Sequence, residues 1–249
     1  MKKSLLNQFQ LLCSTSRKGL ALLIDPDKAG TERLKRVVDL ANIHRPDVFL
    51  VGGSLVAGTE IHEVVQFIKA HSDIPVILFP GSPTQIVKEA DGILFLSLIS
   101  GRNPELLIGK HVEAAPILKK TRLEILPTGY MLVDCGKATT ANYISHTFPI
   151  PHHKPQIAAC TALAGEMLGL QMVYMDGGSG ADKPVSPEMI QAVKSQLSIP
   201  LMVGGGIRTA ENATKAWDSG ADIIVVGTVI EENPELLEYL CQARYIHAN

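Results

Sequence analysis

The sequence predicts a (β/α)8 barrel, and three observations lead to this fold class. Eight short apolar runs follow one another along the 249 residues. These runs carry few polar residues, as expected of parallel strands that are covered on both faces. Segments with helical hydrophobic spacing separate them, and eight strand–helix units in roughly 250 residues match the size of this barrel. An open doubly wound sheet is the alternative, but it usually has fewer strands and a topological switch point.

The expected elements follow in chain order. The strands are residues 20–24, 47–51, 75–79, 92–96, 129–134, 172–175, 200–203 and 222–226. The helices are residues 31–43, 60–71, 104–120, 155–169, 187–196, 210–220 and 233–244. Residues 139–154 form the one irregular insertion, and it follows the fifth strand. Since no shift in composition marks a boundary, residues 1–249 are interpreted as one barrel domain.

The first 18 residues predict a helical cap. Leu5, Leu6, Phe9 and Leu12 recur at helical spacing. Polar residues interrupt the apolar run, so the segment does not have the pattern of a signal peptide. No apolar run in the chain approaches the ~18 residues that are needed to span a bilayer.

The composition excludes several classes of protein. The 23 Lys and Arg nearly cancel the 25 Asp and Glu, which argues against nucleic acid as a partner. The same balance argues against simple electrostatic attachment to a membrane, although transient contact with a membrane surface stays open. The four cysteines show no CxxC spacing, so we expect reduced thiols in a cytoplasmic protein.

Three glycine-bearing loops follow the last three strands. They are residues 176–180 (DGGSG), 204–208 (GGGIR) and 227–228 (GT). Phosphate is bound by convergent backbone N–H groups, and glycine lets the chain approach closely or adopt a positive φ. Ser179 and Thr228 add hydroxyl donors, and Arg208 either pairs with the phosphate or lies solvated in the next helix. The loops predict a phosphate site; the alternative is that the glycines only make tight turns.

A metal site is the second prediction. Asp25 ends the first strand and is expected to point into the barrel mouth, with Ser54 at the matching place on the next strand. Mg²⁺ takes one or two protein oxygens and completes its shell with waters and substrate phosphates. Residue types alone leave an Asp25–Lys28 surface pair as an equal alternative.

Candidate catalytic residues stand on the fifth and sixth strands. Asp176 lies between the phosphate loop and the barrel centre, where a general base or hydroxyl-orienting group is needed. Its alternative role is to cap a turn. Tyr130 and Tyr174 are either core aromatics or hydroxyl donors to a ligand, and Tyr130 is included with Asp176 in the catalytic prediction.

The chain resembles the geranylgeranylglyceryl phosphate synthase family, which includes the bacterial heptaprenylglyceryl phosphate synthases. The resemblance covers nearly the whole barrel. It is carried by LIDPDK (23–28), VGGS (51–54), ILFPGSP (77–83), PTGYMLVD (127–134), YMDGGSGA (174–181), VGGGIRT (203–209) and VVGT (225–228). The pair DPDK and YMDGGSG is the specific part, since many phosphate-binding barrels have a GGGIR loop.

The resemblance implies a reaction and a set of site residues. A prenyl diphosphate, with geranylgeranyl diphosphate as the first candidate, would be joined to the 3-hydroxyl of sn-glycerol 1-phosphate with release of diphosphate. Asp25 and Ser54 match the Mg²⁺ positions. The glycerol phosphate pocket matches Tyr174, Met175, Asp176, Gly177, Gly178, Ser179, Gly180, Gly205, Gly206, Gly227 and Thr228. The resemblance also implies a homo-oligomer.

One position departs from the family pattern, and two other readings compete with this function. Many family members carry Glu where this chain has Asp176, whose side chain is one methylene shorter. The prenyl tail needs an apolar groove, for which residues 93–99 and 104–108 are candidates. A phosphate-binding barrel isomerase or lyase of small phosphorylated metabolites would share the glycine loops. A barrel that binds a phosphorylated ligand without turnover is the non-enzymatic reading.

Overall fold

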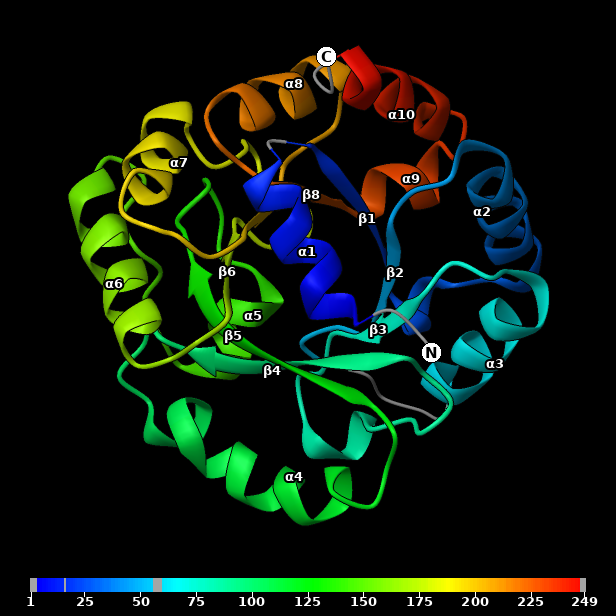
Figure 1. Ribbon diagram of the computed structural model, residues 1–249, viewed down its shortest axis with the longest axis horizontal. Helices are drawn as coiled ribbons and strands as arrows, with labels where there is room; N and C mark the ends of the chain where they lie inside the picture. The colour runs from blue at the N-terminus through cyan, green and yellow to red at the C-terminus, as the bar shows by residue number, and fades with distance from the viewer. Residues whose placement is uncertain (1–3, 16, 56–59, 247–249) are drawn as a thin grey trace.

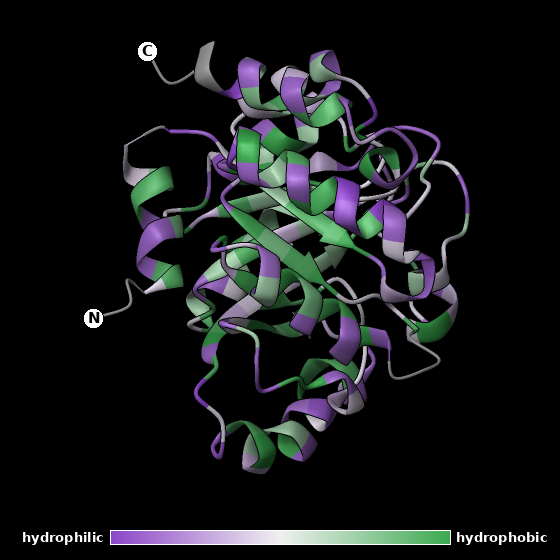
Figure 2. Ribbon diagram, turned by 90° about the vertical axis from the view of Figure 1, so that its right-hand side faces the viewer, coloured by the Kyte–Doolittle hydropathy of each residue, from purple (hydrophilic) through white to green (hydrophobic). Residues whose placement is uncertain are grey.

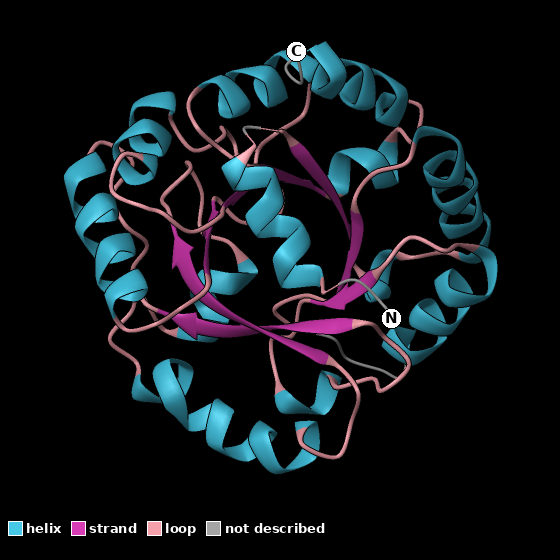
Figure 3. Cartoon of the chain, in the orientation of Figure 1, coloured by secondary structure: helices cyan, strands magenta, loops and turns pink. Residues whose placement is uncertain are grey.

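The fold is a closed barrel of eight parallel strands inside a ring of helices (Figures 1 and 3). The computed structural model describes residues 4–15, 17–55 and 60–246. Each strand pairs with the next along the chain, and β8 closes the ring by pairing with β1, Gly19 opposite Ile223. The predicted fold class is therefore confirmed.

Strands and helices alternate along the chain. The strands are β1 (Gly19–Ile24), β2 (Val48–Val51), β3 (Val76–Leu78), β4 (Gly92–Leu98), β5 (Glu124–Leu132), β6 (Met172–Asp176), β7 (Leu201–Gly204) and β8 (Ile223–Val226). The α-helices are α1 (Leu5–Ser14), α2 (Thr31–His44), α3 (Glu60–His71), α4 (Lys110–Leu118), α5 (Thr140–Ser145), α6 (Pro155–Met167), α7 (Pro187–Lys194), α8 (Ala210–Asp218), α9 (Thr228–Glu232) and α10 (Leu236–Ile246). Two 3₁₀ turns, η1 (Pro26–Lys28) and η2 (Pro83–Gln85), and one π-helical turn, η3 (Glu105–Gly109), complete the order.

The two-residue period of the strands divides the apolar side chains into an inner and an outer core. Along β6, Met172 and Tyr174 lie in the inner cluster, whereas Val173 and Met175 lie in the outer cluster between strands and helices. Asp176 continues the inward series at the carboxyl end of the strand. The same parity runs from Ala21 and Leu23 on β1 to Asp25, the residue that follows the strand. The period thus directs both carboxylates toward the barrel mouth.

Helix α1 lies across the opposite end of the barrel (Figures 1 and 2). Its apolar face adds Leu5, Phe9 and Leu12 to the inner core. At the amino end of the helix, the Glu124 carboxylate accepts hydrogen bonds from Leu5 N at 2.7 Å and Leu6 N at 2.9 Å. A helical cap is therefore present; residues 1–3 and 16 of the expected segment lie outside the described residues.

Strand β5 starts earlier and ends earlier than the predicted 129–134. Glu124 and Pro127 interrupt the apolar pattern, yet β5 pairs with β4 from Gly92 opposite Glu124 to Leu98 opposite Tyr130. Pro127 has no N–H to donate, but its carbonyl accepts the N–H of Gln171. Pairing with both neighbours outweighs local sequence preference here.

Two helix predictions also need correction, and two short helices were not predicted. One of these is α5, which lies in the insertion 139–154 that was expected to be irregular. The expected helix 104–120 is divided, because the π-helical turn η3 precedes α4. The expected helix 233–244 begins only at Leu236. Helix α9 was not predicted, since its five residues are too few to show a helical period. Within the described parts of the chain, every helix is too short or too polar to span a bilayer.

Candidate active site at the carboxyl ends of the strands

A carboxylate and a phenol form a pair on two neighbouring strands. Tyr130 on β5 donates a hydrogen bond from its Oη to Oδ2 of Asp176 on β6, at 2.5 Å. The other carboxylate oxygen, Oδ1, accepts the N–H of Gly178 at 2.7 Å. Tyr130 and Asp176 were the two residues predicted to be catalytic, and the structure brings them together. Through the bond from Gly178, Asp176 also caps the turn that follows β6. The turn-capping role and the pairing with Tyr130 are therefore both present.

Burial changes the proton affinity of this pair. Only 8% of Asp176 is exposed. Burial raises the pKa of Asp176, while the hydrogen bonds from Tyr130 and Gly178 oppose that rise. Burial, together with the nearby Asp176 charge, raises the pKa of Tyr130 well above its ordinary value, so the phenol keeps its proton and remains a donor. The result is a carboxylate that is fixed in place and more basic than an exposed one.

Tyr174 and Met175 lie in different layers. Tyr174 packs in the barrel interior, with its ring centroid 5.5 Å from those of Phe79 and Tyr130. A Cβ at Gly204 would come 2.6 Å from its Oη, so glycine is needed there. Met175 is fully buried in the outer cluster. Its side chain therefore points away from the mouth, and its predicted part in substrate binding is limited to backbone.

The glycine loops after β6, β7 and β8 meet at one place. Ser179 Oγ and Thr228 Oγ1 are 3.3 Å apart, although 49 positions separate them in the chain. A Cβ at Gly205 would lie 2.7 Å from the backbone of Gly177, so the loops pack backbone against backbone. Gly178, Gly180, Gly205 and Gly206 all have positive φ. Helix α9 begins at Thr228 with no side chain capping its first N–H groups. Hydroxyls and backbone N–H groups therefore converge as a phosphate requires.

The basic residues near these loops have local partners. Arg208 donates from Nη2 to the carbonyl of Ala181 at 2.8 Å, which ties the loop after β7 to the loop after β6. Lys137 lies 3.8 Å from an Asp182 carboxylate oxygen and beside Gly180. Arg208 thus joins two of the glycine loops through this hydrogen bond, and its pairing with a phosphate stays a prediction.

Asp25 makes an ion pair in the structure. Its Oδ2 lies 2.9 Å from Lys28 Nζ, and its Oδ1 accepts the N–H of Asp27 at 3.2 Å. Its own N–H donates to Oε1 of Glu231, a buried carboxylate on α9. The plain Asp25–Lys28 pair, the alternative to a metal ligand, is therefore formed here. Glu231 was missed because α9 was not predicted.

The donor set at this point still fits Mg²⁺. The Asp25 side chain is 28% exposed, and its two oxygens keep lone pairs beyond the contacts above. Oδ1 leans toward the β2 loop, 3.8 Å from a Cβ placed at Gly53, next to Ser54. Among the residues that the structure describes, no group of three or more His, Cys, Asp and Glu could hold a metal. A Mg²⁺ ion here would therefore depend on waters and substrate phosphate for most of its shell.

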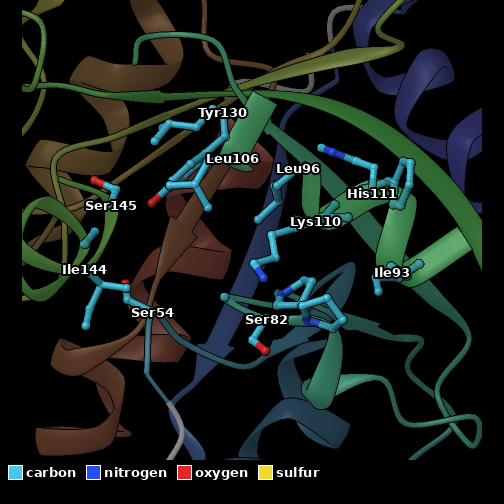
Figure 4. Close-up of a pocket in the computed structure, with 18 of the residues that line it drawn as sticks. Ser54, Ser82, Ile93, Leu96, Leu106, Lys110, His111, Tyr130, Ile144 and Ser145 are labelled. Atoms are coloured by element: carbon cyan, nitrogen blue, oxygen red, sulfur yellow. The ribbon is translucent and has the colours of Figure 1, made fainter. Parts of the chain in front are cut away.

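An apolar groove leads away from the Tyr130–Asp176 pair. The space in it that the centre of a water-sized sphere can occupy is about 120 Å³. Figure 4 shows Ser54, Tyr130 and Ile144 toward one side and Ile93 and His111 toward the other. The wall includes Ile93, Leu94, Phe95, Leu96, Leu98 and Leu106, which belong to the two segments expected to form a groove. Ala141, Ile144 and Ser145 of the insertion were not foreseen, since nothing in their sequence points to a groove.

The fold and site define a (β/α)8-barrel protein with a candidate ligand site at the strand ends, formed by a buried carboxylate, three glycine loops and an apolar groove. The PcrB family model matches residues 14–243, and the chain belongs to this family.

Relatives and solved structures agree with this membership. A protein named geranylgeranylglyceryl phosphate synthase from Spirosoma linguale is 55% identical over 91% of this chain and 91% of its own length. One of the same name from Thermococcus gammatolerans is 43% identical over 85% of this chain and 83% of its own. The crystal structure of (S)-3-O-geranylgeranylglyceryl phosphate synthase from Thermoplasma acidophilum in complex with substrate sn-glycerol-1-phosphate has a TM-score of 0.91 and 32% identity, covering 97% of this chain and 98% of that one.

Proposed function

We propose that the protein is a prenyltransferase that joins a prenyl diphosphate to the 3-hydroxyl of sn-glycerol 1-phosphate and releases diphosphate. One observation carries the proposal: the Tyr130–Asp176 pair stands where the apolar groove meets the glycine loops. An acceptor phosphate on the loops and an apolar tail in the groove would bring their reacting ends to this pair. The names of the relatives and the bound sn-glycerol-1-phosphate of the Thermoplasma protein support both substrates.

The loops position the acceptor. The hydroxyls of Ser179 and Thr228 and the first N–H groups of α9 donate to the phosphate. Asp176 follows from β6 directly into the first of these loops. A glycerol phosphate held there presents its free hydroxyl to a fixed carboxylate, which gives the two reactants a near-unimolecular encounter.

Asp176 takes the proton as the ether forms. The C1–O bond of the prenyl diphosphate breaks, the electron pair leaves with diphosphate, and the glycerol oxygen bonds to the allylic carbon. The proton of that oxygen passes to Asp176, whose burial favours its acceptance. Tyr130 holds Oδ2 by its hydrogen bond and fixes the direction of the carboxylate. The shorter reach of Asp than Glu is compensated by a shifted acceptor or a bridging water.

Asp25 and Ser54 would hold Mg²⁺ at the diphosphate end. The ion would neutralise charge on the leaving diphosphate, the Lewis-acid role of a bound metal. Lys28, 2.9 Å from Asp25, is placed to contact the same diphosphate. The apolar groove would hold the tail and exclude water from the allylic carbon, so that the acceptor hydroxyl and not water is alkylated.

We also propose that the protein forms a homo-oligomer and that it works in the cytoplasm. Phe148, Met167 and Leu168, in and near α6, expose 94%, 76% and 81% of their surface. A groove along α6 is lined by Leu168 together with Ile157, Ala164 and others. A second copy of the chain would cover this face. All four cysteines are free thiols, as in a reducing compartment.

Diphosphate release tests the proposal. Purified protein is mixed with geranylgeranyl diphosphate, sn-glycerol 1-phosphate and Mg²⁺, and diphosphate is measured. We expect release that requires the acceptor, stops with chelator and returns with added Mg²⁺. Acceptor-independent release would contradict the transfer, and release that persists in chelator would contradict the metal site.

A further inference from the structure

A buried imidazole lies in the wall of the apolar groove. His111 on α4 is only 9% exposed and lines the groove away from Ser54 (Figure 4). Its ring meets Phe95 of β4 edge to face, with centroids 4.3 Å apart. Its Nδ1 is buried and makes no hydrogen bond to any described residue. An unpaired buried polar atom costs stability, so apolar packing alone does not explain a histidine here.

The surroundings of His111 supply no counter-charge that reaches it. On α4 itself, Lys110 lines the groove, but its Nζ lies 2.9 Å from Glu113. Strand β4 (GILFLSL) and the turn η2 (PTQ) carry no charged residue. The turn η3 carries Glu105, whose carboxylate lies against Gly109. Across the groove, the other titratable group in its described lining is Tyr130, which is already bonded to Asp176.

The charge state of His111 therefore decides the character of this part of the groove. Burial lowers the pKa of His111, and the carbonyls of Ile108 and Leu96 oppose this only in part. The neutral ring offers an apolar edge and face to a hydrocarbon. The protonated ring would place a cation without a counter-charge beside the hydrocarbon, which cannot solvate it. A tail that covers the ring removes the remaining water and increases this penalty.

We propose that His111 is a specificity-determining residue of the groove, whose neutral imidazole accepts the distal part of a long prenyl tail and whose protonated form rejects it. The inference rests on the proposed prenyl transfer. A tail anchored by its diphosphate beside Asp25 and Ser54 passes Tyr130 and Leu96 before it reaches His111 (Figure 4). Short tails end before the ring, so their binding is independent of its charge.

The test compares two tail lengths across pH. Values of kcat/KM are measured for the C10 and C20 diphosphates from pH 8 to pH 4, with saturating sn-glycerol 1-phosphate, because the pKa of His111 lies below the ordinary 6.5. The ratio of the C20 to the C10 value cancels titration of the catalytic pair, which serves both substrates. We expect this ratio to fall by up to ~10-fold per pH unit below the pKa of His111. The loss should appear in KM of the C20 substrate and not in kcat.

Two variants test whether the pH dependence of this ratio comes from His111. His111→Leu should make the ratio independent of pH while C20 remains a substrate, because an apolar side chain of similar size replaces an unpaired polar one. His153→Leu changes an exposed loop histidine in the same way and should keep the wild-type slope.

The outcomes separate this inference from the proposed function. A wild-type ratio that stays flat over the pH range would overturn the role of His111, even if the Leu variant did not fold. A slope that persists in His111→Leu would do the same. No ether product with either tail at any pH would overturn the proposed function, and the inference with it.

Discussion

Single residues set the chemistry, and Asp176 shows how. One of its oxygens is bound by the Tyr130 hydroxyl and the other by the Gly178 N–H. Burial raises its pKa, whereas these two donors favour the ionised form. Because the base must be ionised, activity should fall as pH falls through this raised pKa, above the value of 3.8 for an ordinary aspartate.

Asp176→Asn should lower kcat by ~10² to 10⁴-fold, the usual contribution of a general base. The amide oxygen still accepts the Gly178 N–H, so thermal unfolding and the KM of sn-glycerol 1-phosphate should change little. Steady-state kinetics and a melting curve measure both. Wild-type kinetics in the variant would remove Asp176 from the mechanism.

Asp25→Ala should abolish turnover, with a loss of ~10²-fold or more, because the proposed Mg²⁺ loses its only carboxylate. The affinity for sn-glycerol 1-phosphate, measured by calorimetry, should stay within about twofold, because the glycine loops are unchanged. Equal losses of turnover and affinity would mean that the metal site has been placed wrongly.

At the scale of secondary-structure elements, the sequence predicts the features that recur along the chain, namely the strands and the glycine loops. It does not predict features that depend on contacts between distant segments. The apolar runs and glycine loops identified the strand ends, and with them Asp25, Asp176 and Ser179. Local sequence could not reveal that α4 and the insertion would face each other across a groove. Nor could it show that the carboxylate of Glu124, a charged residue in β5, accepts a backbone hydrogen bond from the amino end of α1. Both facts depend on contacts between segments far apart in the chain.

Glu124→Gln should weaken the attachment of α1. Burial favours the protonated carboxyl, but the donors Ser4, Leu6 and Leu5 outweigh it and hold the pKa of Glu124 below 4.5. A lowered folded-state pKa contributes stability above the unfolded value, and this is lost as pH falls through the folded one. We expect a loss of about 1 kcal/mol at pH 7, since the group is partly exposed. Urea unfolding should show the difference at pH 7 and none well below pH 4; a difference independent of pH would contradict it.

Ala114→Trp should fill the groove beside α4. Ala114 lines the groove and is buried, so the indole would occupy the space of the distal tail. The kcat/KM for the C20 diphosphate should fall at least ~10-fold relative to the C10 compound, a loss of about 1.4 kcal/mol. Ala115→Trp, on the exposed side of the same helix, is the matched control. Equal effects of the two substitutions would argue against a tail in this groove.

At the scale of the whole molecule, the two ends of the barrel differ: one is covered by a helix and the other carries the candidate site. Helix α1 lies across one end (Figures 1 and 2) and packs on the inner core, while the loops at the other end carry the candidate site. Conservation of the barrel alone does not define activity, since thiamine phosphate pyrophosphorylase from Pyrococcus furiosus shares it with a TM-score of 0.59 at 13% identity. The outer face around α6 is a third region, to which we assign the proposed self-association.

Phe148→Asp should shift the protein to a smaller oligomer, because a charge would be buried in the proposed contact. Light scattering after size-exclusion chromatography measures the mass. Ile43→Asp places the same charge on α2, across the barrel, where Ile43 is 69% exposed, and should leave the mass unchanged. A monomeric wild-type protein would refute the interface.

Product analysis tests the central claim most directly. The protein is incubated with Mg²⁺, prenyl diphosphates from C15 to C35 and either enantiomer of glycerol phosphate, and products are identified by mass spectrometry. We predict a prenyl ether formed from sn-glycerol 1-phosphate and not from its enantiomer, with one tail length preferred. Absence of an ether with every tail, in a folded protein that still binds phosphate, would contradict the account and favour an isomerase or lyase.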